Sequence, residues 1–296
     1  MERQKKINIL SRAALFAAAL IWGSSFFVVK DTVNTIPPNF LLAVRFTIGC
    51  LALALIFRKR LKKLNKEYIW QGAVIGLCLF AAYSSQTIGI TDTTPGKNAF
   101  LTAVYCVIVP FLFWIVNKTR PDIYNMAAAA LCLTGIGLVS LTEGFSIRMG
   151  DALTLLGGFF YALHIVMVAK LAKDKDPVLI SILQFGFAAL AAWVVTLAAE
   201  PFPETLTGST IGAILFLALG CTALALLLQN IGQKYTHPAA ASIILSLESV
   251  FGVFFSVIFY GEELTVRLAA GFVLIFAAII ISETKLNFLR KEACGR

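Results

Sequence analysis

The sequence has few charged side chains and few of the groups that carry enzyme chemistry. Of its 296 residues, 14% are Asp, Glu, Lys or Arg, and two are histidine. It contains no His-Glu-x-x-His, Gly-x-Ser-x-Gly or phosphate-loop motif, and its six cysteines lack the paired spacing of a metal site or disulfide framework. We therefore expect neither an enzyme nor a bound cofactor or metal, and ATP-driven transport would need a partner protein.

Hydrophobic residues make up 59% of the chain, and its mean hydropathy is +0.85. A water-soluble domain could not bury that much apolar surface, so the surrounding solvent is predicted to be lipid. Because lipid offers the backbone no hydrogen-bond partner, apolar runs of about twenty residues are expected to be membrane-spanning helices. The predicted fold is an all-α integral membrane protein with ten transmembrane helices, at residues 11–30, 39–57, 68–90, 96–116, 122–141, 151–172, 177–199, 208–232, 238–260 and 266–282.

Positive charge is distributed unevenly along the chain, whose net charge is +9. When the ten runs alternate across the membrane, twenty of the 25 Lys and Arg residues fall on the side of the termini, and Arg45 lies within a run. The opposite side holds four, namely Lys30, Lys97, Arg148 and Arg267. Cytoplasmic loops carry such an excess, so both termini are predicted to be cytoplasmic and the protein to lie in the cell membrane. No nucleic-acid partner is expected from this placement.

The chain contains an internal repeat. The motif Gln-x-Ile-Gly-x-x-x-Thr-x-Pro runs from Gln86 to Pro95 and recurs 143 residues later, from Gln229 to Pro238. An odd number of spans in each copy forces the second copy to be inverted in the membrane. We therefore predict two inverted five-helix repeats, residues 1–145 and 146–296, with the two prolines opening the fourth and ninth spans. Matches at an offset of 139 residues pair Trp22 with Tyr161, Pro38 with Pro177, Arg45 with Gln184, and Phe46 with Phe185.

Three short stretches resemble a known family. They are Trp22-Gly23-Ser24-Ser25-Phe26, Leu247-Glu248-Ser249-Val250-Phe251 and Tyr260-Gly261-Glu262-Glu263-Leu264-Thr265. The combination resembles the EamA-type transporters of the drug/metabolite transporter superfamily, although Ser249 and Tyr260 replace the usual Pro and Leu. The resemblance implies a secondary carrier, often an exporter of amino acids or other small metabolites, with a central cavity between its two halves.

Glu248 and its repeat counterpart Tyr105 fall near the membrane midplane, about 15 Å from the boundary residues of their spans. Carriers built from inverted repeats bind their substrates at this depth. An acid there costs about 3 kcal/mol on insertion scales, so Glu248 is expected to bind a proton or substrate. The alternative is that Glu248 is a protonated or hydrogen-bonded residue that serves helix packing.

Other polar residues within the spans are predicted to line two vestibules. Arg45 either reaches the lipid headgroups or holds a substrate carboxylate. His164 either carries protons or packs, and the glutamines either bind substrate or join helices. By depth, the outer vestibule contains Ser25, Arg45 and Gln86, and the inner one contains His164, Gln184 and Gln229.

One helical face of the first span carries Trp22, Ser25, Phe26 and Val29. This face either meets substrate, or else faces lipid or packs. Trp22 and Tyr105, whose repeat partners are Tyr161 and Glu248, are the candidates for substrate contact, Trp22 by stacking on a flat substrate. Tyr161 shares a helical face with His164 and is also predicted to line the cavity.

Three local features carry structural predictions. Pro110 is expected to bend the fourth span. Small residues are expected to allow close helix contact at Gly72 and Gly76, and again at Gly208 and Gly212. Glu262 and Glu263 are expected to cap or position the last helix.

These residues together predict a secondary transporter that moves small neutral or zwitterionic solutes, such as amino acids or drugs, by alternating access. Export is expected from the family resemblance and proton coupling from Glu248. The main alternative is a proton-independent facilitator or exchanger in which Glu248 is structural. A membrane enzyme is disfavoured by the missing motifs, and a scaffold by the duplication. The expected partners are the solute, membrane lipids and protons, and the protein is expected to be a monomer or a weak homo-oligomer.

Overall fold

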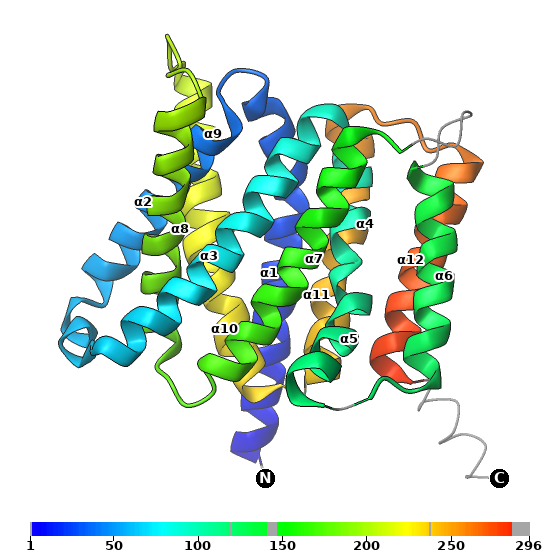
Figure 1. The fold of residues 1–296 in the computed structure, drawn as a ribbon, viewed down its shortest axis with the longest axis horizontal. Helices are drawn as coiled ribbons and strands as arrows, with labels where there is room; N and C mark the ends of the chain where they lie inside the picture. The colour runs from blue at the N-terminus through cyan, green and yellow to red at the C-terminus, as the bar shows by residue number, and fades with distance from the viewer. Residues whose placement is uncertain (1, 119, 141–146, 237, 286–296) are drawn as a thin grey trace.

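The structure is a computed structural model that describes residues 2–118, 120–140, 147–236 and 238–285. Most of the helices run along the length of one bundle (Figure 1). The elements are α1 (Glu2–Val33), α2 (Pro38–Ile56), the 3-10 helix η1 (Arg58–Lys63), α3 (Lys66–Gly89), the 3-10 turn η2 (Ile90–Asp92), α4 (Pro95–Ala103), α5 (Tyr105–Asn117), α6 (Ile123–Ser140), α7 (Met149–Leu171), α8 (Pro177–Ala199), α9 (Gly208–Leu215), the π-helical η3 (Phe216–Leu224), α10 (Ala225–Tyr235), α11 (Pro238–Phe255), the π-helical η4 (Ser256–Tyr260) and α12 (Val266–Thr284).

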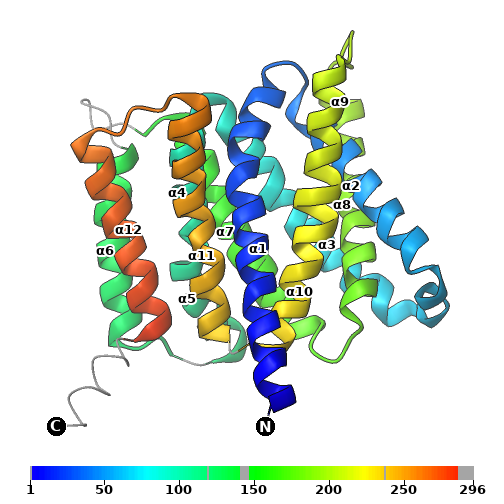
Figure 2. The same cartoon turned by 180° about the vertical axis from the view of Figure 1, so that it is seen from behind.

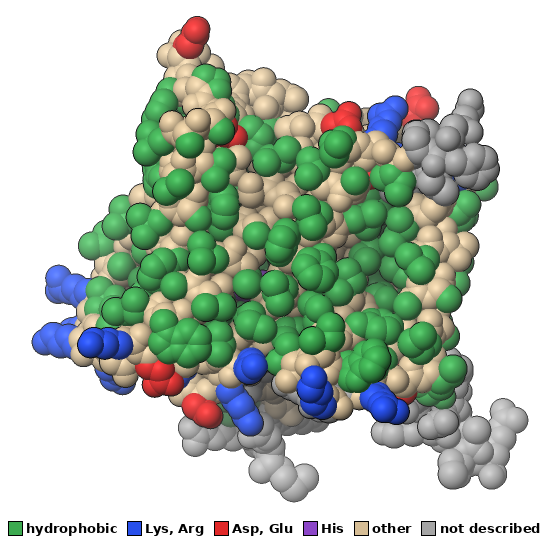
Figure 3. Space-filling model, in the orientation of Figure 1, with side chains coloured by type: hydrophobic (Ala, Val, Ile, Leu, Met, Phe, Trp, Pro, Cys, Tyr) green, Lys and Arg blue, Asp and Glu red, His purple; other side chains and the backbone are tan. Residues whose placement is uncertain are grey.

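Seven helical segments of the described chain are long and apolar enough to cross a membrane. Three shorter apolar helices accompany them, at Ile123–Val139, Ile244–Tyr260 and Val266–Ser282. Hydrophobic side chains cover the middle of the face seen in Figure 3, and most of its Lys and Arg side chains lie at the left edge and along the lower edge. The prediction of an all-helical, multi-pass membrane protein is therefore confirmed for the described residues. The number of helices that cross the membrane stays a prediction.

Helices that are distant in sequence pair in the bundle. α1 packs against α10 and α11, α2 against α8, α3 against both α7 and α8, and α6 against α12. Figures 1 and 2 show α6 and α12 together at one side of the bundle, and α1 beginning at the same edge at which α12 ends. Apolar residues form two buried clusters, one around Phe46 and Phe185 and one around Phe100 and Phe272, and Tyr161 packs against both.

The helix starts follow local sequence signals. Pro95 is the first residue of α4, as the repeat motif predicted, and Pro238 is the first residue of α11. Proline is suited to this position because it has no N–H to leave unsatisfied. Thr94 caps α4, since its side chain accepts a hydrogen bond from the backbone N–H of Lys97.

The fourth predicted span is interrupted immediately before Tyr105. α4 ends at Ala103 and α5 begins at Tyr105, and the carbonyl of Val104 accepts hydrogen bonds from the N–H groups of both Val107 and Ile108. The sequence placed a bend at Pro110, but the structure places the interruption at Val104 and keeps Pro110 inside α5. This interruption makes Tyr105 the first residue of α5.

Glycines on α3 allow close packing against α8. A Cβ atom on Gly76 would lie 2.7 Å from the carbonyl oxygen of Gln184, which is too close for any larger residue. A Cβ atom on Gly72 would lie closer still to Cβ of Leu183. The corresponding prediction for Gly208 and Gly212 is wrong, because a Cβ atom at either position would meet nothing within 4 Å.

Glu262 stabilises the start of α4 rather than the last helix. Its carboxylate accepts hydrogen bonds from the backbone N–H of Gly96 at 2.9 Å, from the hydroxyl of Ser256 at 2.5 Å and from the hydroxyl of Thr94. The last helix, α12, is instead capped by Thr265, whose side chain accepts from the N–H of Leu268. The expectation that Glu262 caps the last helix is therefore wrong. An acid at the N-terminus of α4 also complements the helix dipole.

Replacing Glu262 by Ala removes an acceptor that Thr94, Gly96 and Ser256 share. We expect the free energy of unfolding to fall by about 1.5–3 kcal/mol, the range for hydrogen bonds to a charged group. Glu263→Ala is the matched control because Glu263 is exposed, and it should change stability by less than about 0.5 kcal/mol. Thermal unfolding of the detergent-solubilised protein measures both. Equal stabilities of the two variants would contradict this role of Glu262.

Candidate functional site

A central cavity with about 60 Å³ of accessible volume lies among the helices. Side chains from both predicted repeats line it, from α1 to α5 in the first and from α7, α10 and α11 in the second. Nine of the ten predicted site residues are among them: Trp22, Ser25, Arg45, Gln86, Tyr105, Tyr161, His164, Gln229 and Glu248. The tenth, Gln184, lies behind the cavity wall, where its side-chain oxygen is 3.0 Å from Nε2 of His164.

Glu248 and Tyr105 meet at the cavity. The phenol of Tyr105 donates a hydrogen bond to Oε1 of Glu248 at 3.2 Å, and the Glu248 side chain is 6% exposed. Among the ion pairs of the described residues, none includes Glu248. Within the part of the chain that the structure describes, Glu248 is therefore a buried acid with a neutral partner, Tyr105, and no ion pair.

Arg45 is a buried basic residue that lines the same cavity as Glu248. It is 2% exposed, its Nε donates to the hydroxyl of Thr222 at 2.5 Å, and its guanidinium carbon lies 4.8 Å from the centre of the Tyr83 ring. The possibility that Arg45 reaches the lipid headgroups is therefore wrong. Within the described part of the chain, no carboxylate forms an ion pair with it. Burying a cation without an anion is costly, and the ring of Tyr83 offsets part of that cost.

Gln86 joins three helices beside the cavity. Its side-chain oxygen accepts from the hydroxyl of Tyr161 at 2.9 Å, and its Nε2 donates to the hydroxyl of Thr102 at 2.9 Å. These bonds connect α3 to α7 and α4. Of the two roles proposed for this glutamine, the contact across helices is the one observed.

The predicted face of the first span does line the cavity, so the alternative that it meets lipid is wrong. The indole N–H of Trp22 donates to the carbonyl of Cys221 at 2.8 Å, which joins α1 to η3. The hydroxyl of Ser25 donates to the carbonyl of Trp22 at 2.7 Å. Both polar groups are thus satisfied by carbonyl oxygens, and Phe26 and Val29 contribute apolar surface to the same wall.

Sequence reasoning missed several polar residues of this region. Tyr83 and Thr102 line the cavity, and Thr222 holds Arg45. Asn98 also lines it, and its Nδ2 donates to the hydroxyl of Thr154 at 2.8 Å. Each of these four residues is a polar side chain inside an apolar run, and this pattern in the sequence could have identified them.

A second polar cluster lies at the start of α7. Asp151 is fully buried, and it accepts a hydrogen bond from Thr93 at 2.5 Å. The ammonium of Lys97 is 3.9 Å from its other oxygen. Gly89 and Gly150 pack backbone against backbone beside this pair, since a Cβ on Gly150 would lie 2.6 Å from the carbonyl of Gly89. The cluster therefore joins α3, α4 and α7 at one end of the bundle.

A bundle of apolar helices that encloses a polar cavity with buried, unpaired charges is typical of a membrane transport protein. The chain belongs to the EamA-like transporter family, whose profile matches residues 11–141 and again residues 148–284. It is therefore a membrane transporter.

Proteins that are similar over most of the chain are also named as transporters. An uncharacterized transporter of Archaeoglobus fulgidus is 34% identical over 270 residues, which cover 90% of this chain and 84% of that protein. The uncharacterized inner membrane transporter YedA of Escherichia coli K12 is 27% identical and covers 94% of this chain and 92% of its own length. A crystal structure with 18% sequence identity has the same fold, with a TM-score of 0.67 and coverage of 94% and 98% of the two chains.

Replacing Thr222 by Val removes the hydroxyl that Nε of Arg45 contacts, and leaves a buried donor of a charged group without its acceptor. We expect the free energy of unfolding to fall by about 1.5–3 kcal/mol. Thr196→Val is the matched control, since Thr196 is also fully buried but its hydroxyl has no partner in the described structure. It should be neutral or slightly stabilising. Thermal unfolding in detergent compares the two, and a Thr222→Val variant as stable as Thr196→Val would exclude this contact.

Proposed function

We propose that the protein is a secondary transporter that exports small zwitterionic or neutral metabolites, amino acids among them, by alternating access. The observation that carries this proposal is the pair formed by Arg45 and Glu248. Both are buried, both line one cavity, and neither has an ionic partner among the described residues. A solute with one carboxylate and one ammonium group would supply the missing charge to each.

Alternating access requires two halves that rock about a common axis. Division into inverted repeats, residues 1–145 and 146–296, is supported by the two separate matches of the family profile. It is also supported by two contacts between repeat counterparts. The rings of Phe46 and Phe185 stack with centroids 6.1 Å apart, and Tyr105 bonds to Glu248. Residues related by a two-fold axis can touch only if they lie beside that axis.

Helix packing supports the same axis. In the predicted repeats, α1 corresponds to α7, α3 to α10, and α4 to α11. The contact of α1 with α11 therefore corresponds to that of α7 with α4, and the contact of α1 with α10 corresponds to that of α7 with α3. The contacts α2 with α8 and α6 with α12 pair each helix with its own counterpart. Together with the excess of Lys and Arg that the sequence predicts on the side of the termini, the inverted arrangement favours cytoplasmic termini in the cell membrane.

The cavity favours a small solute with a single carboxylate. A multiply charged phosphate would require several cations, whereas Arg45 is the only Lys or Arg among the residues that line the cavity. The accessible volume of about 60 Å³ holds only a few waters, so the state described is one with little room for a solute. Tyr83, Tyr105 and Tyr161 give the walls aromatic faces that accept a flat or apolar side group.

Replacing Arg45 by Gln tests the carboxylate site. In proteoliposomes, counterflow of an amino acid should show an apparent KM raised about tenfold to a hundredfold, because one charge-assisted hydrogen-bonded contact is lost. The matched control is the corresponding amine without the carboxylate, whose transport should respond far less to the same substitution. If no amino acid in a panel is transported or competes, or if Arg45→Gln affects acid and amine equally, the proposed substrate class is wrong.

Proton coupling is proposed to depend on Glu248. An intramembrane acid is costly as a carboxylate, so proton binding and release as the site changes sides would relieve that cost. Glu248→Gln keeps the shape and the contact with Tyr105 but cannot titrate. We expect a pH gradient to drive solute accumulation in wild type and to have no effect in Glu248→Gln, with Glu263→Gln as the control that retains coupling. Equal gradient dependence of Glu248→Gln and wild type would favour the facilitator, in which Glu248 is structural.

A further inference from the structure

The short helix η1, which connects α2 to α3, is strongly basic. Its sequence is Arg-Lys-Arg-Leu-Lys-Lys, and Lys66 follows at the start of α3. Arg58, Lys59, Lys62, Lys63 and Lys66 are exposed, and no ion pair among the described residues includes any of them. Figure 3 shows Lys and Arg side chains gathered at the left edge of the molecule, where Figure 1 places this connection.

Two acids close to η1, Asp176 and Glu67, are already paired with Arg60 and Lys175. Asp176 accepts two hydrogen bonds from Nη1 of Arg60, both at 2.9 Å, and Glu67 pairs with Lys175 at 2.7 Å. The carboxylate of Asp176 also caps α8 through the N–H of Val178. No free carboxylate among these residues remains to neutralise the exposed cations of η1.

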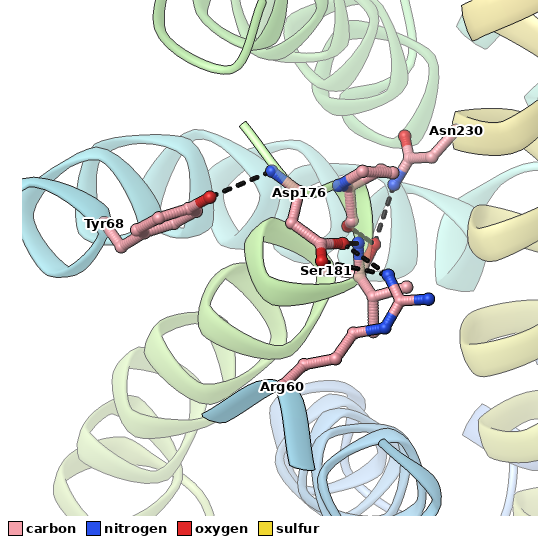
Figure 4. A network of polar contacts seen from close by, with 7 residues as sticks. Arg60, Tyr68, Asp176, Ser181 and Asn230 are labelled. Carbon is pink, nitrogen blue, oxygen red and sulfur yellow. Dashed lines mark hydrogen bonds and ion pairs between the residues drawn. The ribbon is translucent and has the colours of Figure 1, made fainter. Parts of the chain in front are cut away.

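Two kinds of contact hold η1 in place. Arg60 reaches Asp176 in the α7–α8 connection, whose backbone N–H donates to the hydroxyl of Tyr68 (Figure 4). On the other side, Phe57 and Leu61 pack against the apolar core. Because these contacts fix one face of η1 to the protein, its remaining cations form an ordered surface rather than a loose tail.

The flanking residues place η1 at the depth of the lipid headgroups. Leu55 and Ile56, three and two residues before it, are 72% and 71% exposed, as expected of side chains that face hydrocarbon. Ile69 and Trp70, shortly after it, are also exposed, and tryptophan is enriched where hydrocarbon meets headgroups. The exposed cations therefore lie where apolar, lipid-facing surface gives way to the polar boundary of the bilayer.

We propose that Arg58, Lys59, Lys62, Lys63 and Lys66 form a docking surface for the headgroups of anionic phospholipids. Juxtamembrane clusters of four to eight Lys or Arg residues attract such lipids, and the surface offers positive charge that the protein itself leaves uncompensated. Arg60 connects this surface to the start of α8 through Asp176.

The test measures thermal unfolding of the detergent-solubilised full chain with added lipid. Phosphatidylglycerol is expected to raise the Tm of wild type, and phosphatidylcholine to raise it much less. A variant with Lys59→Gln, Lys62→Gln and Lys63→Gln should lose most of the phosphatidylglycerol shift. The matched control changes the same total charge at the same end of the bundle, through Arg12→Gln, Arg120→Gln and Lys170→Gln, and should keep that shift.

Three results would overturn the proposal. One is a phosphatidylglycerol shift of equal size in the η1 variant and the control variant, which would place lipid binding elsewhere. Another is an equal shift with phosphatidylcholine, which would show that headgroup charge is irrelevant. The third is a shift of the same size with inorganic phosphate, which would make a soluble anion the occupant. If the η1 variant unfolds before measurement, Lys59→Gln alone should show a smaller lipid shift than Lys170→Gln alone.

Discussion

A lipid bilayer offers no hydrogen-bond partner, and the rest of this structure depends on that constraint. Backbone groups pair within helices, and polar side chains turn away from lipid, so that residues such as Arg45, Gln184 and Glu248 are buried. The hydrophobic effect does not hold helices together in lipid, so close packing and polar contacts replace it. Gly76 lets α3 approach the backbone of α8, and Gln86 joins α3 to α4 and α7. The polar cavity results from the same constraint.

The two halves apply this constraint differently at the two ends of the bundle. At the end away from the termini, buried hydrogen bonds join Thr93 to Asp151 and Asn98 to Thr154. At the repeat offset of 143 residues, Asn98 corresponds to Ala241, which cannot form such a bond. The duplicated motif has kept its helix-starting proline in both halves, but the polar contacts differ: Asn98 bonds Thr154 at one end, and Nδ2 of Asn230 donates to the hydroxyl of Ser181 at the other.

The apolar runs and the few polar residues inside them made much of this arrangement predictable. The bounds of the apolar runs were close to those of the helices, as for residues 177–199 and α8, because length and composition dominate in lipid. Polar residues inside such runs pointed to the cavity for the same reason. Tyr83 was missed because its repeat counterpart, Leu226, is apolar, whereas Tyr105 and Tyr161 pair with Glu248 and Trp22. The orientation of Arg45 could not be predicted, since sequence gives the depth of a residue along a helix but not the neighbour that it faces. Glu262 reaches α4 through a contact between segments 166 residues apart, which local pattern does not reveal.

In the proposed function, the buried side chains of Arg45 and Glu248 relate substrate class and proton coupling to the direction of transport. Each charge is costly while the cavity is closed to water, by about 3 kcal/mol on insertion scales. A zwitterion relieves both costs, whereas a proton relieves only that of Glu248. The ammonium group of a substrate and a proton would then compete for the same carboxylate, so binding of one favours release of the other. An inward proton gradient would load Glu248 from outside, and the returning carrier would exchange that proton for substrate at the cytoplasmic side. Export coupled to protons thus requires only that the substrate ammonium occupies the position next to Glu248 and Tyr105.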